Sequence, residues 1–294
     1  MKTPQNKKPK LAKKLNVKNI YFKREDLHPY GSHKGRSIPK MINHYSKQDK
    51  RKFVISSSGN AALAAAKKVL DAEDEIKLKI FVGKKINTDK LTKIKELAQK
   101  SSQIELEQKQ RPKQSAFQKN KESDWVYLRQ STDDIALKGY KILANELSKI
   151  EDLQAVFIPA SSGTTAQGIF EGFKENKNNS KQIPEIHIVQ TEYCHPIAEE
   201  FDQDFQDQDN RSIASAIVDK IAHRREKVIE AVKESSGSGW VLSDEKIKEA
   251  QNIVKKNTDL DISANSALSI GALQKAKNQD WSWKGSICCL VCGE

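Results

Sequence analysis

Lys34 has sequence surroundings that suit covalent chemistry. A short strand pattern ends at Lys23, and the turn residues Tyr30, Gly31 and Ser32 precede a helix for which Ser32 is the expected N-cap. Lys34 is therefore expected just inside the positive end of a helix and among other cations, which favours early loss of its proton. Such an amine can form a Schiff base with an aldehyde. The alternative is that Lys34 is one more solvated lysine in a lysine-rich chain.

Two further turns between a strand and a helix are rich in glycine and hydroxyl residues. Residues 161–165 offer backbone N–H groups, hydroxyls and a helix N-terminus, a combination that binds phosphate. They lack the lysine of a P-loop and the glycine spacing of a dinucleotide site, so the expected ligand is an isolated phosphate monoester. In residues 56–60, Gly59 can adopt a positive φ, and Asn60 begins a helix with an amide that donates and accepts. Either turn alone is also consistent with an ordinary helix cap.

The elements that position these turns alternate between strand and helix. Apolar runs predict strands at 20–23, 53–56, 77–82, 104–106, 125–128, 155–158, 186–190, 240–242 and 287–291. Helical spacing predicts helices at 9–15, 34–45, 61–70, 89–100, 135–150, 164–174, 196–201, 224–234, 244–256 and 264–277. Residues 107–123 give little signal and are expected to form a polar helix or a loop, and 202–210 are expected to form a surface loop. The alternation predicts an α/β fold of parallel sheets covered by helices, with ligands at the carboxyl ends of the strands.

The composition is that of a large α/β protein with a heavily charged surface. The 294 residues suffice for two lobes, and 37% hydrophobic residues allow a packed core beside 31% charged residues. No apolar run is long enough to span a membrane, so no membrane partner is expected. The basic N-terminus has no apolar segment behind it, which argues against a secretory signal.

The net charge of +12 is concentrated near the N-terminus. Residues 1–52 contain sixteen Lys and Arg against three Asp and Glu, and the remainder is close to neutral. A basic arm of this kind can bind nucleic acid or an acidic membrane. Because neither interleaved aromatic residues nor a nucleic-acid-binding module accompanies it, we expect a solvated face or a field that attracts anionic ligands, and no nucleic-acid partner.

The four cysteines do not form a disulfide framework in a chain of this size. The spacing of Cys288, Cys289 and Cys292 is compatible with zinc, but they lie on or beside an apolar run that predicts a buried strand. Because no second pair of ligands is nearby, we expect structural cysteines and no metal. Free thiols are consistent with a cytoplasmic location.

Taken in chain order, these segments resemble the fold type II enzymes that use pyridoxal 5'-phosphate (PLP), in the tryptophan synthase beta superfamily. The match is closest to the threonine synthase-like members. Residues 22–27 and 31–34 are similar to the KREDLNPTGSFK segment of that family, and residues 57–62 to its SSGNAA loop. Residues 159–165 are similar to its glycine-rich phosphate loop, and weaker similarities occur at 139–141, 189–192, 241–245 and 263–273.

The resemblance implies roles for the matched residues. Lys34 would form the Schiff base with PLP and move the α-proton of the substrate, while Asn60 would contact the ring oxygen and Cys292 the pyridine nitrogen. The residues that would hold the phosphate are Ser161, Ser162, Gly163, Thr164 and Thr165. Those that would line the pocket for the substrate carboxylate are Ser57, Ser58 and Ala61.

The resemblance also implies an architecture and an activity. Residues 1–40 with 140–294 would form a large lobe and 41–139 a small inserted lobe, with PLP in the cleft between two parallel-sheet lobes. The activity would be a threonine synthase-like lyase reaction that converts O-phosphohomoserine to threonine and phosphate. The substrate would be a small amino acid, and the family is commonly dimeric, which favours a homodimer.

Three matched positions depart from the family pattern and leave the reaction open. Gly35 stands where the family often has Asp, Ser161 where it often has Gly, and Cys292 where it usually has Ser or Thr. A thiol is a weaker hydrogen-bonding partner than a hydroxyl. Alternative activities are a threonine/serine dehydratase or a cysteine synthase-like β-replacement enzyme. The alternative from another class is an inactive PLP-binding protein, or a basic nucleic-acid-binding protein, on this scaffold.

Overall fold

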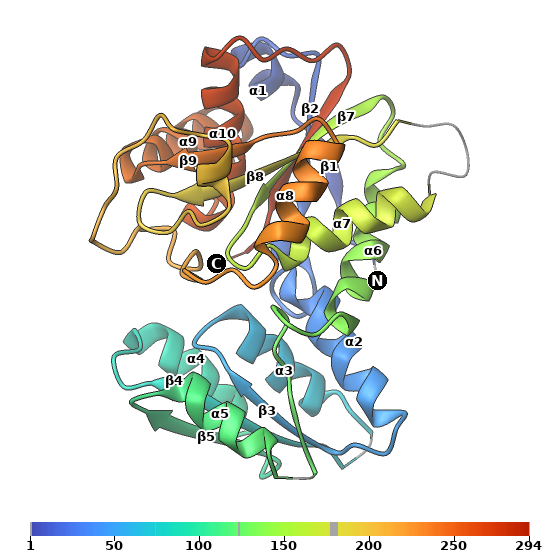
Figure 1. Cartoon of the computed structure of the whole chain (residues 1–294), viewed down its shortest axis with the longest axis vertical. Coiled ribbons are helices and arrows are strands. Elements are labelled where there is room, and N and C mark those ends of the chain that lie inside the picture. Colours follow the sequence, from blue (N-terminus) through green and yellow to red (C-terminus); the bar gives the residue numbers. More distant parts are fainter. Residues whose placement is uncertain (1, 74, 123, 177–181, 294) are drawn as a thin grey trace. The chain divides into compact units, whose positions relative to one another are not determined.

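The chain folds into two compact units, each built on its own sheet. The computed structural model describes residues 2–73, 75–122, 124–176 and 182–293 (Figure 1). The large unit comprises Met1–His28 and Tyr140–Glu294, and the small unit comprises Pro29–Gly139. The contacts therefore group residues 29–40 with the small unit, whereas the sequence had suggested the large lobe.

The physical reason is the packing of one helix. Helix α2 (Lys34–Ser46) buries Ile38, Met41 and Ile42 completely in the core of the small unit. This apolar stripe at helical spacing contacts helix α3 (Asn60–Leu70) of the same unit. Lys34, the first residue of α2, is thus part of the small unit.

The small unit holds a parallel sheet with helices on both faces. Among the described residues its strands lie in the order β5-β4-β3-β6 and all pair in parallel. The strands are β3 (Lys52–Ser56), β4 (Lys77–Gly83), β5 (Ile104–Lys109) and β6 (Trp125–Tyr127). Helices α2, α3 and α4 (Thr88–Ala98) supply the core on one face, and α5 (Pro112–Asn120) packs on the other face against Val54 and Phe81.

The large unit is built on a sheet whose described strands run in the order β1-β2-β10-β7-β8-β9. The strands are β1 (Gln5–Lys7), β2 (Asn19–Arg24), β7 (Leu153–Pro159), β8 (Glu185–Thr191), β9 (Gly239–Leu242) and β10 (Ser286–Val291). Only β1 is antiparallel among these strands. The central strand β10 is buried along its whole length, as expected for a parallel sheet covered on both faces.

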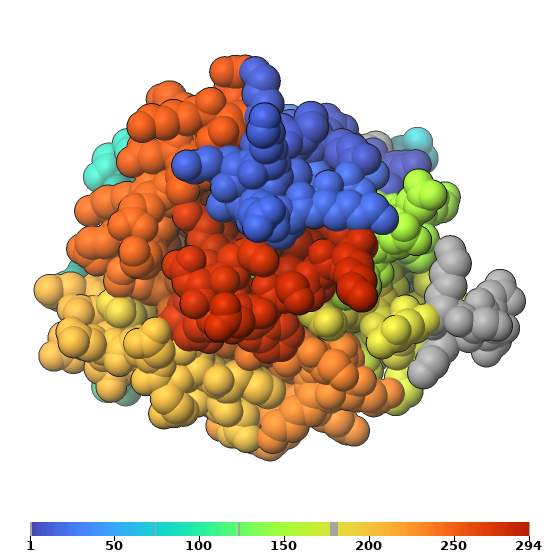
Figure 2. Space-filling view, turned by 90° about the horizontal axis from the view of Figure 1, so that it is seen from above, coloured from blue at the N-terminus to red at the C-terminus, as the bar shows by residue number. Residues whose placement is uncertain are grey.

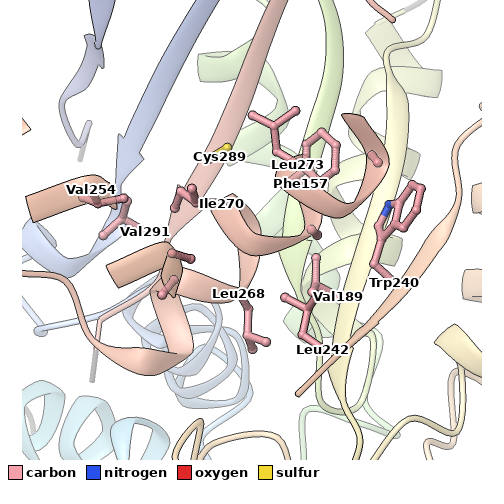
Figure 3. Packing of buried hydrophobic residues seen from close by; sticks show 14 of the residues in the cluster. Phe157, Val189, Trp240, Leu242, Val254, Leu268, Ile270, Leu273, Cys289 and Val291 are labelled. Carbon is pink, nitrogen blue, oxygen red and sulfur yellow. The ribbon is translucent and has the colours of Figure 1, made fainter. Parts of the chain in front are cut away.

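Alternate residues of the central strands point into different cores. The first core contains Phe157 and Cys289 and packs under α1 (Pro9–Lys14), α9 (Asp244–Thr258) and α10 (Ala264–Asn278). Figure 3 shows Leu273 and Ile270 of α10 beside these strands. The second core contains the neighbouring Val156 and Cys288, and packs under α6 (Ile135–Leu147), α7 (Thr164–Glu175) and α8 (Arg225–Glu234). The two-residue period of a strand therefore supplies both faces.

The N-terminal segment closes one edge of the large unit. Helix α1 buries Leu11 and Ala12 and contacts α9, while its lysines Lys10, Lys13 and Lys14 are exposed. Figure 2 shows this segment (blue) beside α9 (orange) and the residues near the C-terminus (red). Part of the expected basic face is therefore present on this helix.

A buried histidine on β8 lies in a cluster of aromatic rings. His187 is fully buried, stacks on Phe157 with ring centroids 4.4 Å apart, and has its Nε2 3.0 Å from a carboxylate oxygen of Glu185. The indole N–H of Trp240 donates to His187 Nδ1 at 3.1 Å, and that of Trp283 donates to Glu185 at 2.6 Å. Burial lowers the pKa of His187, while Glu185 acts in the opposite direction. The neutral ring with its proton on Nε2 satisfies both neighbours.

The structure differs from several of the secondary-structure predictions. Strand β1 was not predicted, and the polar helix or loop expected between strands 104–106 and 125–128 contains helix α5. The short helix expected at 196–201 is a 3₁₀ turn, η3 (Ala198–Glu200). A second 3₁₀ turn, η1 (Glu25–Leu27), follows β2. Residues 202–210 form no helix or strand, but Asp202 is buried and pairs with Lys275 at 2.7 Å, so this segment is not entirely a surface loop.

All four cysteines are free and buried, as expected for structural cysteines. Within the described ranges, no group of His, Cys, Asp and Glu side chains could hold a metal ion. No helix in the described part of the chain is long and apolar enough to cross a membrane.

Candidate functional site

The turn before α2 places Lys34 at the beginning of a helix. Gly31 has a φ of +85°, a conformation that glycine adopts without strain. The buried hydroxyl of Ser32 accepts the backbone N–H of Lys34 at 3.3 Å. The N-cap residue is His33, so the expectation that Ser32 is the N-cap is wrong, and Ser32 lies one position before it. The side chain of Lys34 is half-buried, at an end of the helix where N–H groups are directed outward.

Two contacts hold the first turn of α2 in place. The side-chain amide of Gln130 donates to the hydroxyl of Ser37 at 2.7 Å, and that hydroxyl contacts the carbonyl of Lys34 at 3.4 Å. The backbone of Gly139 lies directly against Arg36, where a Cβ would come within 2.1 Å of the Arg36 carbonyl oxygen. The resemblance at 139–141 thus includes a glycine that the packing requires.

The turn after β3 begins the neighbouring helix. The hydroxyl of Ser57 accepts the N–H of Gly59 at 3.3 Å, and α3 begins at Asn60 as expected. Gly59 has a φ of −147°, so the expected positive φ is wrong. Ser58 is exposed, and Ala61 is half-buried. Because α2 and α3 pack together, the small unit holds Lys34 and the 57–61 turn on neighbouring helices.

In the large unit, residues 161–165 form the turn between β7 and α7. Gly163 is the N-cap with a φ of +82°, and a Cβ there would lie 2.6 Å from Val228 Cγ2, so the turn requires glycine. The hydroxyls of Ser162 and Thr164 lie 2.9 Å apart. Helix α7 extends for 12 residues behind this turn, and the N–H groups of its first turn have no carbonyl partners within the helix. These N–H groups and the hydroxyls beside them suit a phosphate.

Gln190 holds the backbone before this turn, and its role was not predicted. Its side chain is fully buried on β8, and its amide nitrogen donates to the carbonyls of Ala160 at 3.2 Å and Ser161 at 3.4 Å. Its amide oxygen accepts the N–H groups of Ile197 and Ala198, both at 2.8 Å. The signal in the sequence was a glutamine at the end of the predicted strand 186–190.

Cys292 lies at the same edge of the sheet as the 161–165 turn. It directly follows β10, which pairs in parallel with β7, so the carboxyl ends of both strands meet at one edge. Cys292 is buried, and its backbone N–H donates to Ser266 Oγ at 3.1 Å. Gly293, with a φ of +95°, has its carbonyl bound by the hydroxyl of Ser263 at 2.7 Å.

The charged residues of the KRED segment bind one another or their neighbours. Lys23 is fully buried, with its amine 2.5 Å from Glu146 Oε2 and 2.8 Å from the carbonyl oxygen of Thr3. Glu25 is also fully buried and accepts the hydroxyl of Thr3 at 2.5 Å. Lys23 therefore joins the N-terminal segment and α6 to β2, and Glu25 joins the N-terminal segment to η1, so both have structural roles.

The predicted residues fall into two groups. Lys34, Asn60 and the substrate-pocket residues Ser57, Ser58 and Ala61 belong to the small unit. The phosphate turn and Cys292 belong to the large unit. A cavity of about 560 Å³ in the large unit, lined by residues that include Leu242, Lys246 and Gln274, is separate from both groups.

The residues fit PLP by chemical type. The cofactor has an aldehyde, a phosphate and a ring with a nitrogen and an oxygen. The chain provides an amine at the start of α2, a phosphate-binding turn at the start of α7, an amide at the start of α3 and a thiol after β10. The glycine conformation and the Gln190 hydrogen bonds hold the phosphate turn in shape without a ligand.

Comparisons with known proteins agree with this chemistry. Residues 1–293 match the protein family described as "Pyridoxal-phosphate dependent enzyme". The threonine synthase of Methanocaldococcus jannaschii is 26% identical over 93% of this chain and 69% of its own length. The catabolic L-threonine dehydratase TdcB of Staphylococcus aureus is 24% identical over 99% of this chain and 83% of its own.

Solved structures show the same fold. A pyridoxal 5'-phosphate-dependent aspartate racemase superposes with a TM-score of 0.81 at 21% identity, over 99% of this chain and 89% of its own. A fungal L-serine ammonia-lyase from Rhizomucor miehei superposes with a TM-score of 0.79 at 18% identity, over 100% of this chain and 93% of its own. The match to the family extends over nearly every residue, so the chain belongs to the pyridoxal-phosphate-dependent enzymes of fold type II, and its cofactor is PLP.

Proposed function

We propose that the chain is a PLP-dependent lyase that converts O-phosphohomoserine to threonine and phosphate. The observation that carries the proposal is the sequence SSGNAA in the turn that begins α3. It occurs in the threonine synthase order, between the Lys34 turn and the phosphate turn. The similarity to the threonine synthase of M. jannaschii over 93% of the chain supports this assignment.

In this proposal each residue has a defined task. The amine of Lys34 holds the cofactor aldehyde and afterwards carries the α-proton of the substrate. The turn formed by residues 161–165 holds the phosphate, and Asn60 orients the ring through its oxygen. Ser57, Ser58 and Ala61 hold the substrate carboxylate. When bound, PLP supplies an electron sink for the negative charge that develops at the substrate α-carbon.

Cys292 places a thiol, in place of a hydroxyl, at the ring nitrogen in this proposal. A thiol is a weak hydrogen-bond donor and carries no positive charge that it could share with the ring. An uncharged partner at this position suits elimination and replacement at the β- and γ-carbons of an amino acid. This chemistry includes the proposed reaction and also its nearest alternatives.

The second candidate is a threonine/serine dehydratase. The observation that favours it is the similarity to the S. aureus threonine dehydratase over 99% of the chain. A cysteine synthase-like β-replacement enzyme uses the same residues with a different second substrate. An inactive PLP-binding or basic binding protein on this scaffold remains the alternative without catalysis.

The decisive experiment compares substrates on the purified protein supplied with PLP. O-phosphohomoserine should yield threonine and phosphate in equal amounts, whereas threonine and serine should yield little keto acid. Lys34→Ala should abolish both turnover and the visible absorbance of protein-bound PLP. Lys40→Ala, which changes an exposed lysine on the same helix, is the matched control and should retain both.

The other results would each reject the proposed reaction. Keto acid from threonine without threonine from O-phosphohomoserine would identify a dehydratase. Visible absorbance without turnover of any of these substrates would indicate an inactive PLP-binding protein. A protein that stays colourless with added PLP would contradict the assigned roles of Lys34 and the phosphate turn.

The proposal also includes a homodimer in a reducing, cytoplasmic compartment. The burial of four free cysteines supports the reducing compartment, because such thiols need no disulfide partner. Sedimentation of the purified protein at several concentrations tests the dimer, and a monomer at all of them would reject it.

A further inference from the structure

Residues 212–219 of the large unit form no helix or strand. Several of their backbone N–H groups donate hydrogen bonds to side chains elsewhere in the large unit. The N–H of Ile213 donates to both carboxylate oxygens of Asp244 at 3.2 Å. The N–H of Ala216 donates to the amide oxygen of Asn265 at 2.9 Å. Irregular backbone needs such partners because its N–H groups have no regular ladder to join.

The last two residues of this segment are tied to the phosphate turn. The N–H groups of Val218 and Asp219 both donate to Ser161 Oγ, each at 3.2 Å. Ser161 is the first residue of the turn, and its carbonyl accepts the side-chain amide of Gln190 at 3.4 Å. One serine thus connects the 212–219 segment, the turn before α7 and, through Gln190, strand β8.

Apolar packing holds the middle of the segment, and hydrogen bonds to other side chains hold its two ends. In its middle, Ala214 and Ile217 are buried in the first core, whereas Ile213 near its beginning is 39% exposed. At its end, the side chain of Val218 is 49% exposed, so the core contributes less there. The two hydrogen bonds to the Ser161 hydroxyl should therefore help to hold residues 218–219 in place.

The hydrogen bonds also limit what the Ser161 hydroxyl can do for a ligand. A hydroxyl oxygen has two lone pairs, and here both are occupied by backbone N–H groups. Its own proton remains available, but the geometry of the oxygen is set by the segment. A glycine, which the family often has at this position, could not make this connection.

We propose that Ser161 is a positioning residue that couples the order of the 212–219 segment to occupancy of the cofactor phosphate site. The proposal rests on the proposed role of residues 161–165 in holding that phosphate. A phosphate that restrains the turn also restrains Ser161 Oγ, and hence the N–H groups of residues 218 and 219. Because such coupling is reciprocal, ordering of the segment must strengthen phosphate binding by the same factor by which the phosphate favours the ordered segment.

The test measures amide hydrogen exchange at residues 218–219, with Ile213 and Ala216 as internal controls. In the protein without PLP, Ser161→Ala should accelerate exchange at 218–219 by about tenfold or more, because two hydrogen bonds are lost. Exchange at Ile213 and Ala216 should stay within about twofold of wild type, because their acceptors are intact. Ser161→Thr keeps the hydroxyl and should restore slow exchange.

A neighbouring variant separates the hydroxyl from the turn as a whole. Ser162→Ala removes a hydroxyl from the same turn but leaves both bonds to the segment, so exchange at 218–219 should match wild type. Added PLP should slow exchange at 218–219 in wild type and in Ser161→Thr. It should have no such effect in Ser161→Ala, even at PLP concentrations where that variant shows full visible absorbance.

The outcomes for the two proposals are distinct. Equal exchange at 218–219 in wild type and Ser161→Ala, without PLP, would overturn the positioning role whether or not PLP binds. Visible absorbance in both proteins with the same PLP-induced slowing would overturn the coupling while leaving the proposed function intact. A wild-type protein that takes up no PLP would refute both the proposed function and the coupling. The comparison of exchange without PLP would still show whether the Ser161 hydroxyl holds residues 218–219.

Discussion

The buried pair between Lys23 and Glu146 gives a sharp test of how the large unit is held together. The amine of Lys23 lies 2.5 Å from the carboxylate of Glu146, and the two side chains are 0% and 9% exposed. A further hydrogen bond joins the amine to the carbonyl of Thr3 at 2.8 Å. The perturbation is Lys23→Met, which keeps a long unbranched chain and removes the charge.

The expected cost follows from leaving a carboxylate buried without its partner. Breaking a buried ion pair from one side typically lowers the free energy of unfolding by about 3–5 kcal/mol. Replacing both charges by apolar groups of similar volume is often neutral or stabilising by about 1–4 kcal/mol, because desolvation of the pair is avoided. Lys23→Met with Glu146→Leu should therefore be much more stable than Lys23→Met alone.

The assay is urea unfolding followed by circular dichroism for wild type, both single variants and the double variant. The control cycle uses Lys227 and Glu230, an exposed pair at 3.1 Å whose side chains are 69% and 62% exposed. Because water screens the charges, such a pair contributes only about 0.3–0.5 kcal/mol to the free energy of unfolding. A cost below about 1 kcal/mol for Lys23→Met, or a double variant no better than the single, would refute the argument that this pair is desolvated and coupled.

Three further predictions follow from the structure. Because burial lowers the pKa of His187, the unfolded chain takes up a proton below pH about 6.5 while the folded ring stays neutral. The free energy of unfolding should thus fall by up to about 1.4 kcal/mol per pH unit below that value and be unaffected by this group above it. Urea unfolding of wild type and His187→Gln at about pH 5.5 and 7.5 measures this, and equal pH dependence in both proteins would contradict it. Burial raises the pKa of the Cys288 thiol to about 12 and that of Cys289 well above its ordinary value, so none of the four buried cysteines should react rapidly with a thiol reagent until the protein is denatured. Fast labelling of the native protein would count against their burial. Gly163→Ala should weaken PLP binding and destabilise the protein by about 1–3 kcal/mol, because its Cβ would meet Val228 in a left-handed conformation. PLP titration and urea unfolding against Gly83→Ala, where a Cβ meets nothing within 4 Å, provide the check.

Local patterns predicted most helices and strands to within a few residues. Helix α3 was expected at 61–70 and occupies Asn60–Leu70, and strand β10 was expected at 287–291 and occupies Ser286–Val291. In both, the apolar pattern is continuous and its ends carry turn residues. The segment of helix α5 was left open between a polar helix and a loop, because its apolar residues Ala116 and Phe117 are adjacent and form no stripe along the helix.

The sites were harder, because a side chain's partner is often distant in sequence. The roles of Lys34, Asn60 and the phosphate turn came from motifs and stay predictions. The structure adds Gln190, which joins residues about 30 positions upstream and about seven downstream, and the Ser161 bonds to residues 218 and 219. A motif consists of residues that are close together in the sequence, so it gives no information about contacts between distant residues.

The sequence by itself determined the alternation of strands and helices, the three turns that begin α2, α3 and α7, and the family they indicate. Those features depend on residues within a few positions of one another, where periodicity, caps and glycine act directly. Only the tertiary structure decided that Lys23 is buried against Glu146, 123 positions away, while Lys34 begins a helix of the small unit. Two lysines eleven positions apart received different roles because burial and partners depend on long-range packing, which no local pattern specifies.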